Sequence, residues 1–279
     1  MCMFKQHLPL ILLLILLAAW ALFLEKTADV FVFGFPRNEY SYQAAFSEVM
    51  FPAQDGSILS ALYAPARKGR PTFLMFHGNK QNVYTVQNFM VPYVQEGFGA
   101  LLFDYRGYGK SEGKPSEKNM KEDGQSALNF LMERKLISPQ EIILWGVSLG
   151  STPAIDLAAE HNDWPFKATI LQSPFTNTTD MAFFTLARRE KDRFLAPILS
   201  VLLKPFLWDK QFDQTARIGE IRTPLLIGAS RQDKVVPAFL TTALSAKAPA
   251  QTEVFIAEGG EHDSPLWFEQ AVLDFINKL

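Results

Sequence analysis

Cysteine is nearly absent from this chain of 279 residues, in which Cys2 is the only one. A single thiol cannot form a disulfide framework, and it cannot supply a cysteine-based metal site. Histidine is also scarce, with four in the chain, and none stands beside carboxylates at the spacing of a metal-binding motif. The sequence therefore predicts no metal and no organic cofactor.

Long runs of one charge are missing as well. The 27 basic and 29 acidic residues leave a formal net charge of −2, so the chain lacks the basic footprint of a nucleic-acid-binding protein. Gly107 and Gly109 share one turn, but its spacing is not that of a nucleotide-binding loop. Apolar residues make up 48% of the chain, which is enough for one large domain or two small ones.

Charge disappears altogether between Leu8 and Leu24. About 17 helical residues rise roughly 26 Å, close to the thickness of a bilayer core. The sequence therefore predicts a single membrane anchor in residues 1–26, a linker in residues 27–45 and one domain in residues 46–279. A signal sequence is the alternative, because Ala19-Trp20-Ala21 offers a small-x-small cleavage site.

The residues that flank this apolar segment indicate its orientation. Lys5 precedes it, and Glu25 and Lys26 follow it, which favours a cytoplasmic N-terminus. The domain would then lie outside the cytoplasm, anchored to the membrane, or it would be secreted or periplasmic after signal cleavage. The aromatic stretch Phe31–Pro36 either lies along the membrane surface or packs on the domain.

Beyond this leader, short apolar runs alternate with longer helical patterns, which is typical of an α/β fold with a mostly parallel sheet. An antiparallel hairpin is expected at the sheet edge, because Phe46–Phe51 and Ser57–Tyr63 flank a turn signal. The other predicted strands are Phe73–Phe76, Ala100–Phe103, Ile142–Trp145, Thr169–Leu171, Leu225–Ile227 and Glu253–Ala257. The predicted helices are Val83–Gln95, Ser116–Arg134 and Leu149–Glu160.

A serine stands between two glycines in Trp145-Gly146-Val147-Ser148-Leu149-Gly150, directly after an apolar run. Where a strand turns sharply into a helix, its backbone approaches both neighbours, and only residues without a Cβ fit at the flanking positions. Such a turn holds the serine hydroxyl out at the edge of the sheet. We therefore predict that Ser148 is a catalytic nucleophile.

Two further groups follow predicted strands, at the edge where open α/β sheets bind ligands. Asp233 comes after Leu225–Ile227, and His262 comes after Glu253–Ala257. An imidazole can accept the serine proton at neutral pH and later return it, and a carboxylate can fix its tautomer. We predict that His262 is the base and Asp233 the acid. The competing carboxylates are Asp209, Asp213 and Asp263.

The chain order Ser148, Asp233, His262, with a strand, a sharp turn and a helix around the serine, resembles the α/β-hydrolase superfamily. The resemblance runs from about Phe46 to the C-terminus. The turn His77-Gly78-Asn79, the segment Asp104–Ser111 and the apolar N-terminus look like the branch of small membrane-associated serine hydrolases that includes lysophospholipid lipases and acyl-protein thioesterases. The resemblance implies an α/β-hydrolase fold with helices on both faces of the sheet.

The resemblance also implies where the negative charge of the transition state is stabilised. The N–H of Leu149, directly after the nucleophile, is one expected oxyanion donor, and the superfamily pattern points to Asn79 as the second. His77, Asp104 and Arg106 are expected to organise loops rather than to touch the substrate.

The connection between Pro174 and Pro224 is longer than a strand–helix–strand unit requires. We predict an insertion over about residues 175–223 that forms a short helical lid, whose apolar underside lines an acyl pocket. The alternative is that this apolar segment packs into the core of the domain.

The combined pattern predicts a serine hydrolase that cleaves a carboxylic ester or thioester through an acyl-serine intermediate. Its expected substrate is a small acyl or lipid-like molecule. A peptidase of the same fold is one alternative. A non-catalytic binding or scaffold protein is another, although the presence of serine, acid and base in the expected order argues against it.

Overall fold

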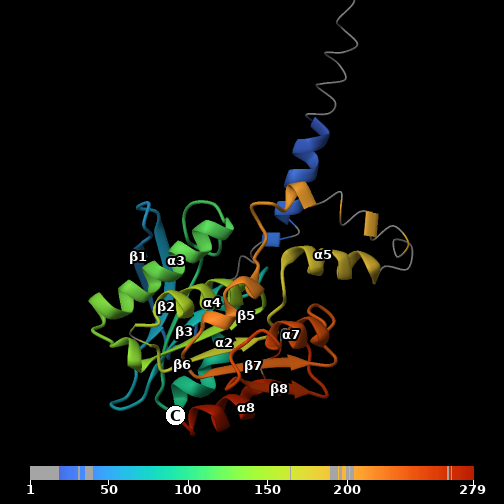
Figure 1. Cartoon of the computed structure of the whole chain (residues 1–279). Coiled ribbons are helices and arrows are strands. Elements are labelled where there is room, and N and C mark those ends of the chain that lie inside the picture. Colours follow the sequence, from blue (N-terminus) through green and yellow to red (C-terminus); the bar gives the residue numbers. More distant parts are fainter. Residues whose placement is uncertain are drawn as a thin grey trace, which may run out of the picture.

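The structure is a computed structural model, and it describes residues 19–30, 32–34, 40–163, 165–188, 194, 197–198, 201, 204–262, 264 and 266–279. The centre of this described part is an eight-stranded sheet with helices packed against it (Figure 1). Its strands are β1 (Ser47–Pro52), β2 (Ile58–Ala64), β3 (Thr72–Phe76), β4 (Gly99–Phe103), β5 (Ile142–Val147), β6 (Ala168–Gln172), β7 (Leu225–Ser230) and β8 (Glu253–Ala257).

The strand order in the sheet is β1-β2-β4-β3-β5-β6-β7-β8. β1 and β2 form the predicted hairpin, in which Ser47 pairs with Tyr63 and Pro52 pairs with Ile58. β2 is antiparallel to β4, whereas every neighbouring pair from β4 to β8 is parallel. The prediction of a mostly parallel sheet with an antiparallel hairpin at its edge is confirmed.

The helices α2 and α3 begin at residues whose side chains cap them. Asn82 caps α2 by accepting a hydrogen bond from the N–H of Thr85, whose hydroxyl in turn accepts one from the N–H of Asn82. Ser116 caps α3 by accepting a hydrogen bond from the N–H of Asn119. The helices are α2 (Val83–Gln95), α3 (Glu117–Asn129), α4 (Ser151–Glu160), α5 (Thr178–Ala187), α7 (Ala238–Ser245) and α8 (Leu266–Ile276).

Two predicted helix boundaries differ from the structure. The helix expected to continue to Arg134 leaves the α-helical hydrogen-bond pattern after Asn129, and Phe130–Arg134 form a wider π-helical turn. The helix expected to begin at Leu149 begins at Ser151 instead, because Ser148–Gly150 form a tighter 3-10 turn.

The central strands supply two hydrophobic cores, one on each face of the sheet. Every residue of β3, β4, β5, β6 and β7 is buried, as expected for parallel strands that are covered on both faces. Leu74 and Phe76 of β3 belong to the core that includes α3, α4 and α7. Phe73 and Met75 belong to the opposite core, which includes α2 and α8.

Residues 19–30 are helical, and this helix rises away from the sheet (Figure 1). Residues 1–18, which make up most of the predicted membrane anchor, lie outside the described residues. Of the helices in the described ranges, none is both long enough and apolar enough to cross a bilayer. The anchor therefore gains no support here and stays a prediction.

Part of the predicted linker packs on the domain. Val32 and Phe33 are 3% and 4% exposed, and both belong to a core that they share with residues of the sheet. The sequence left open whether this aromatic stretch lies along a membrane surface or packs on the domain. Val32 and Phe33 pack on the domain.

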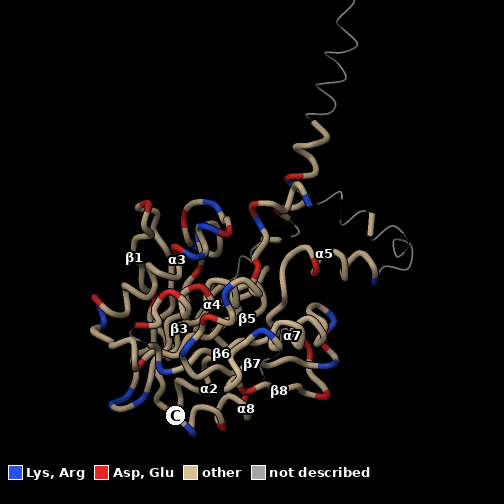
Figure 2. Tube along the Cα trace, viewed as in Figure 1, with Lys and Arg blue, Asp and Glu red and all other residues tan. Residues whose placement is uncertain are grey.

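Basic and acidic residues are interspersed along the described chain (Figure 2). Arg106 and Lys210 are buried cations, and Arg106 is the more deeply buried of the two, with its side chain 2% exposed. It binds the carboxylates of Asp55, Glu122 and Asp123 at 2.7, 2.8 and 2.6 Å. Through these pairs Arg106 fixes the loop after β4 against α3, which is the organising role expected for it.

Gly228 in β7 tests how closely α8 packs on the sheet. A Cβ at position 228 would lie 2.2 Å from Cε2 of Phe268, which is fully buried. We expect Gly228→Ala to lower the free energy of unfolding by about 1–3 kcal/mol, because overpacking forces the ring and its helix to shift. Urea denaturation measures this change. Gly259→Ala is the matched control, since the atoms nearest to a Cβ there lie 3.6 Å away, and a loss no larger than that of the control would contradict the packing argument.

Candidate active site

Ser148 lies at the carboxyl end of β5, in the sharp turn that the sequence predicts. Its φ is +53°, in the left-handed region that is strained for residues with a Cβ. A Cβ at Gly146 would lie 2.6 Å from the Cα of Ser151, and one at Gly150 would lie 2.3 Å from the carbonyl oxygen of Phe76. Both glycines are therefore needed for the turn to fit between β3 and α4.

His262 and Asp233 form a hydrogen-bonded pair next to this turn. Nδ1 of His262 lies 2.7 Å from Oδ2 of Asp233. The hydroxyl of Ser173 donates to the same carboxylate oxygen at 2.9 Å. Oδ1 accepts hydrogen bonds from the backbone N–H groups of Val235 and Val236 at 2.8 and 2.9 Å. Both carboxylate oxygens thus have donors, which fixes the direction in which Asp233 faces the imidazole.

Two opposing effects set the pKa of Asp233. Burial raises it, but the hydrogen bond and the charge of His262, together with the N–H groups of Val236 and Val235, lower it by more, so that this pKa lies below its ordinary value. The carboxylate is therefore ionised at neutral pH and favours the imidazole tautomer that carries its proton on Nδ1.

Ser148 and His262 line one cavity of about 360 Å³, which Asn79 also lines. Ser148 is 6% exposed. In the described structure its hydroxyl is not hydrogen-bonded to the imidazole, which is hydrogen-bonded to Asp233. Hydrogen bonds between nucleophile and base are often loose before substrate binds. The fold thus brings the three predicted catalytic residues to one end of the sheet.

The two predicted oxyanion donors lie close to the nucleophile. Leu149 follows Ser148 in the 3-10 turn, and Asn79 lies in the loop after β3. A Cβ on Gly78, the neighbour of Asn79, would lie 3.4 Å from the Cβ of Ser148, so this loop passes directly beside the turn. Leu149 and Asn79 also line a second cavity together with Ser148. Their part in charge stabilisation stays a prediction.

His77 is buried behind this loop. It is 1% exposed, and its Nδ1 lies 2.9 Å from the carbonyl oxygen of Gly78. The rings of Tyr105 and Tyr108 pack against the imidazole at centroid distances of 4.5 and 5.2 Å. These contacts hold the loop that carries Asn79, in agreement with the structural role expected for His77.

The second cavity beside Ser148 has a volume of about 460 Å³. Its apolar lining includes Leu149 and Phe175, and Met181 and Phe184 of α5. Three cations also line it, namely Lys80, Arg188 and Lys234. α5 belongs to the predicted insertion, so a helix of that segment does cover the site. Residues 189–193, 195–196, 199–200 and 202–203 of the insertion lie outside the described residues, and a mobile lid stays a prediction.

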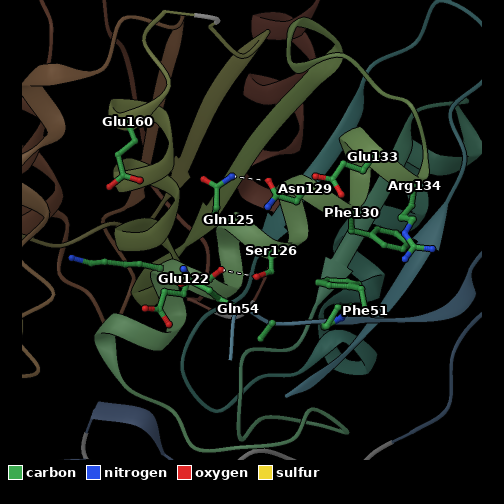
Figure 3. A pocket seen from close by; sticks show the side chains of 13 residues that line it. Phe51, Gln54, Glu122, Gln125, Ser126, Asn129, Phe130, Glu133, Arg134 and Glu160 are labelled. Carbon is green, nitrogen blue, oxygen red and sulfur yellow. Dashed lines mark hydrogen bonds between the residues drawn. The ribbon is translucent and has the colours of Figure 1, made fainter. Parts of the chain in front are cut away.

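A third cavity, of about 540 Å³, lies between the β1–β2 hairpin and α3 (Figure 3). Phe51 and Phe130 stack in it at a centroid distance of 4.8 Å, and the lining is otherwise largely polar. It contains none of the predicted catalytic residues. Although three glutamates line it, no group of three or more His, Cys, Asp or Glu within the described ranges is arranged to hold a metal ion.

Two residues that support the site were missed in the sequence. Ser173 binds Asp233 as described above, and it directly follows β6. The rule that ligand sites lie beyond strand ends would have pointed to it. Gln214 bridges two loops, because its Nε2 lies 3.4 Å from the carbonyl oxygen of Ser148 and its Oε1 accepts from the N–H of Phe175 at 3.2 Å. Gln214 lies within the insertion, where no sequence signal marks it.

Comparison with known proteins agrees with this geometry. The family model described as the alpha/beta hydrolase fold matches residues 71–207. The chain belongs to the α/β-hydrolase superfamily. Among its curated relatives is alpha/beta hydrolase domain-containing protein 17C of Xenopus laevis, which is 28% identical over 253 residues, or 88% of this chain and 71% of the relative.

Solved structures of other α/β-hydrolases share the fold. A hydrolase from Vibrio vulnificus superposes with a TM-score of 0.70 at 22% identity, and covers 85% of this chain and 82% of its own. An esterase from Pyrococcus furiosus gives a TM-score of 0.67 at 18% identity, with coverages of 88% and 98%. At these identities the likeness shows the fold alone, and together with the superfamily it supports a hydrolase.

Ser173 offers a test of how the carboxylate is positioned. Ser173→Ala removes the hydrogen bond to Oδ2 of Asp233. Because alanine also carries a Cβ, the backbone strain at φ +48° stays the same. We expect the kcat for ester hydrolysis to fall about 10-fold, as for other partners that orient a catalytic group, while KM stays within about 2-fold. Steady-state kinetics with a p-nitrophenyl ester measure both. Ser245→Ala on α7 is the control, and an unchanged kcat in Ser173→Ala would contradict the positioning role.

The lowered pKa of Asp233 predicts how acid affects stability. The carboxyl group has a pKa of about 3.9 in an unfolded chain and a lower one in the folded chain. Its ionised form therefore stabilises the fold above about pH 4, and this stabilisation is lost as the pH falls through the folded value. We expect Asp233→Asn to be less stable than the wild type at neutral pH, by an amount that shrinks below about pH 4.

Urea denaturation over a series of pH values tests this expectation. Asp163→Asn, which changes an exposed carboxylate, is the control and should differ little from the wild type. A stability difference for Asp233→Asn that stays constant into strong acid would show that the carboxylate is not stabilised in the folded chain.

Proposed function

We propose that this α/β-hydrolase is a serine hydrolase that cleaves a carboxylic ester or thioester of an acyl substrate through an acyl-serine. One observation carries the proposal. Ser148, held in a left-handed turn at the end of β5, lines one cavity with His262, whose Nδ1 lies 2.7 Å from the buried carboxylate of Asp233. This arrangement supports general-base activation of a serine hydroxyl.

In the first half of the proposed reaction, Oγ of Ser148 attacks the carbonyl carbon while His262 takes its proton. The carbonyl oxygen becomes negatively charged, and the N–H groups of Leu149 and Asn79 stabilise it. The bond to the alcohol or thiol then breaks. The leaving group departs with the proton from the imidazolium, and an acyl-serine remains.

In the second half, water gives a proton to His262 as its oxygen attacks the acyl carbon. The bond between that carbon and Oγ of Ser148 breaks, and the imidazolium returns its proton to Oγ. The free carboxylic acid leaves, and the enzyme is restored. Asp233 stays ionised throughout and stabilises the imidazolium in both halves.

The lining of the cavity beside Ser148 supports an acyl group as the part of the substrate that becomes covalently attached. Leu149, Phe175, Met181 and Phe184 give it apolar walls. Its volume of about 460 Å³ falls in the range of roughly 300–1,000 Å³ typical of small-molecule sites. Apolar walls next to the nucleophile favour a hydrocarbon chain over a polar acyl group.

Labelling with a fluorophosphonate probe tests the nucleophile in the full-length chain. We expect the wild type to be labelled and Ser148→Ala to lose both the label and at least about 10³-fold of its ester hydrolysis, because no other group replaces the attacking oxygen. Ser245→Ala should keep both. A folded wild type that takes no label and hydrolyses no ester would contradict the proposal and favour a non-catalytic binding protein.

A p-nitrophenyl ester series from acetate to palmitate, run with the same proteins, tests the acyl chain. The apolar cavity predicts that kcat/KM rises with chain length beyond acetate. A sharp preference for acetate would contradict an acyl-chain site while leaving the serine mechanism intact.

A further inference from the structure

Residues 27–30, at the end of the N-terminal helix, and residues 32–34 form a segment that packs into the core near the active site. Ala28, Val32 and Phe33 are 2%, 3% and 4% exposed. All three belong to the hydrophobic core that also contains Leu149 and Phe175, two residues that line the cavity beside Ser148. The segment therefore shares its packing with the wall of the candidate active site.

Three different contacts hold this segment in place. The hydroxyl of Tyr108 donates to the carbonyl oxygen of Phe33 at 2.7 Å. The Phe33 ring meets the ring of Phe212 edge-on, with centroids 5.9 Å apart. Nζ of Lys210, a side chain only 6% exposed, lies 2.8 Å from the carboxylate of Asp209 and 3.2 Å from that of Asp29. A buried cation is stabilised by such partners, and the pair with Asp29 adds a specific attachment to the apolar contacts.

The end of the segment lies against the loop that carries the predicted oxyanion donor. Gly34 has a φ of +62°. A Cβ at this position would lie 2.6 Å from Oδ1 of Asn79 and 2.3 Å from Cγ of Lys80. The backbone at Gly34 therefore touches the side chains of both loop residues, and only glycine fits there without displacing them.

The segment also lines the substrate cavity itself. Thr27, Val30 and Val32 line the cavity of about 460 Å³ together with Ser148. Met181 and Phe184 of α5 line the same cavity, and in Figure 1 the N-terminal helix and α5 lie on the same side of the sheet. Side chains from two segments far apart in the sequence thus enclose the space next to the nucleophile.

We infer that residues 27–30 and 32–34 form, together with α5, the binding site for a single aliphatic acyl chain, and that Val30 sets the chain length that Ser148 accepts. This inference rests on the proposed function for its catalytic part. Part of the predicted linker would then have a direct role in substrate specificity. The hydrocarbon chain would lie between Val30 and Val32 on one side and α5 on the other, with its carbonyl carbon at Ser148.

Val30→Trp in the full-length chain tests the inference by hydrolysis. Val30 is 42% exposed, so a larger side chain can be placed there without overpacking the buried core. We expect kcat/KM for p-nitrophenyl decanoate to fall at least 10-fold relative to that for the acetate, because the indole fills the space of the chain. Leu22→Trp is the matched control, since Leu22 is on the same helix, is 59% exposed and is not part of the cavity lining.

Binding of decanoate to Ser148→Ala provides a measurement that needs no catalysis. Isothermal titration calorimetry should show at least 10-fold weaker binding when Val30→Trp is added, and no such change when Leu22→Trp is added. If the chain-length profile and the decanoate affinity of Val30→Trp match those of Leu22→Trp, the inference is overturned. If Val30→Trp weakens decanoate binding but no ester is hydrolysed by the wild type, the acyl site stands and the hydrolase proposal fails.

Discussion

The close approach of three backbone segments at Ser148 is the constraint on which the rest of the site depends. β5 must turn into α4 within a few residues, and the carbonyl oxygen of Phe76 in β3 lies where a side chain at position 150 would be. Gly146 and Gly150 make this approach possible. Because β3 and β5 are neighbours in the sheet, the same packing places the loop after β3, with Asn79, beside the nucleophile.

The turn, the strands of a mostly parallel sheet and the placement of the three candidate catalytic residues at one edge of that sheet could be predicted from the sequence, because each has a local signal. Two glycines around Ser148 specify the turn, and fully apolar runs specify buried parallel strands. Asp233 and His262 each follow a predicted strand, and the carboxyl ends of parallel strands lie at one edge of a sheet, so the two residues could be placed together before any contact between them was known. The fold and the superfamily are confirmed, whereas the catalytic roles themselves remain proposals.

Other features depend on tertiary contacts that carry no local signal. An apolar stretch such as Val32 and Phe33 fits a membrane surface as well as a protein core, and only contacts with distant residues such as Tyr108 and Phe212 show that Phe33 packs on the domain. Gln214 is one polar residue in a long insertion, and its role depends on hydrogen bonds to Phe175 and Ser148, which lie far from it in the sequence. The change to a π-helical turn after Asn129 likewise has no counterpart in the apolar periodicity.

Ser148 and Ser173 share a strained backbone conformation, which affects how the chain can evolve. Both follow neighbouring parallel strands, and both have a positive φ, of +53° and +48°, a conformation that costs about 1–3 kcal/mol for each residue with a side chain. Glycine would adopt it freely. Stability therefore favours glycine at these two positions, whereas the proposed chemistry needs both hydroxyl groups, and selection for stability alone would be expected to remove them.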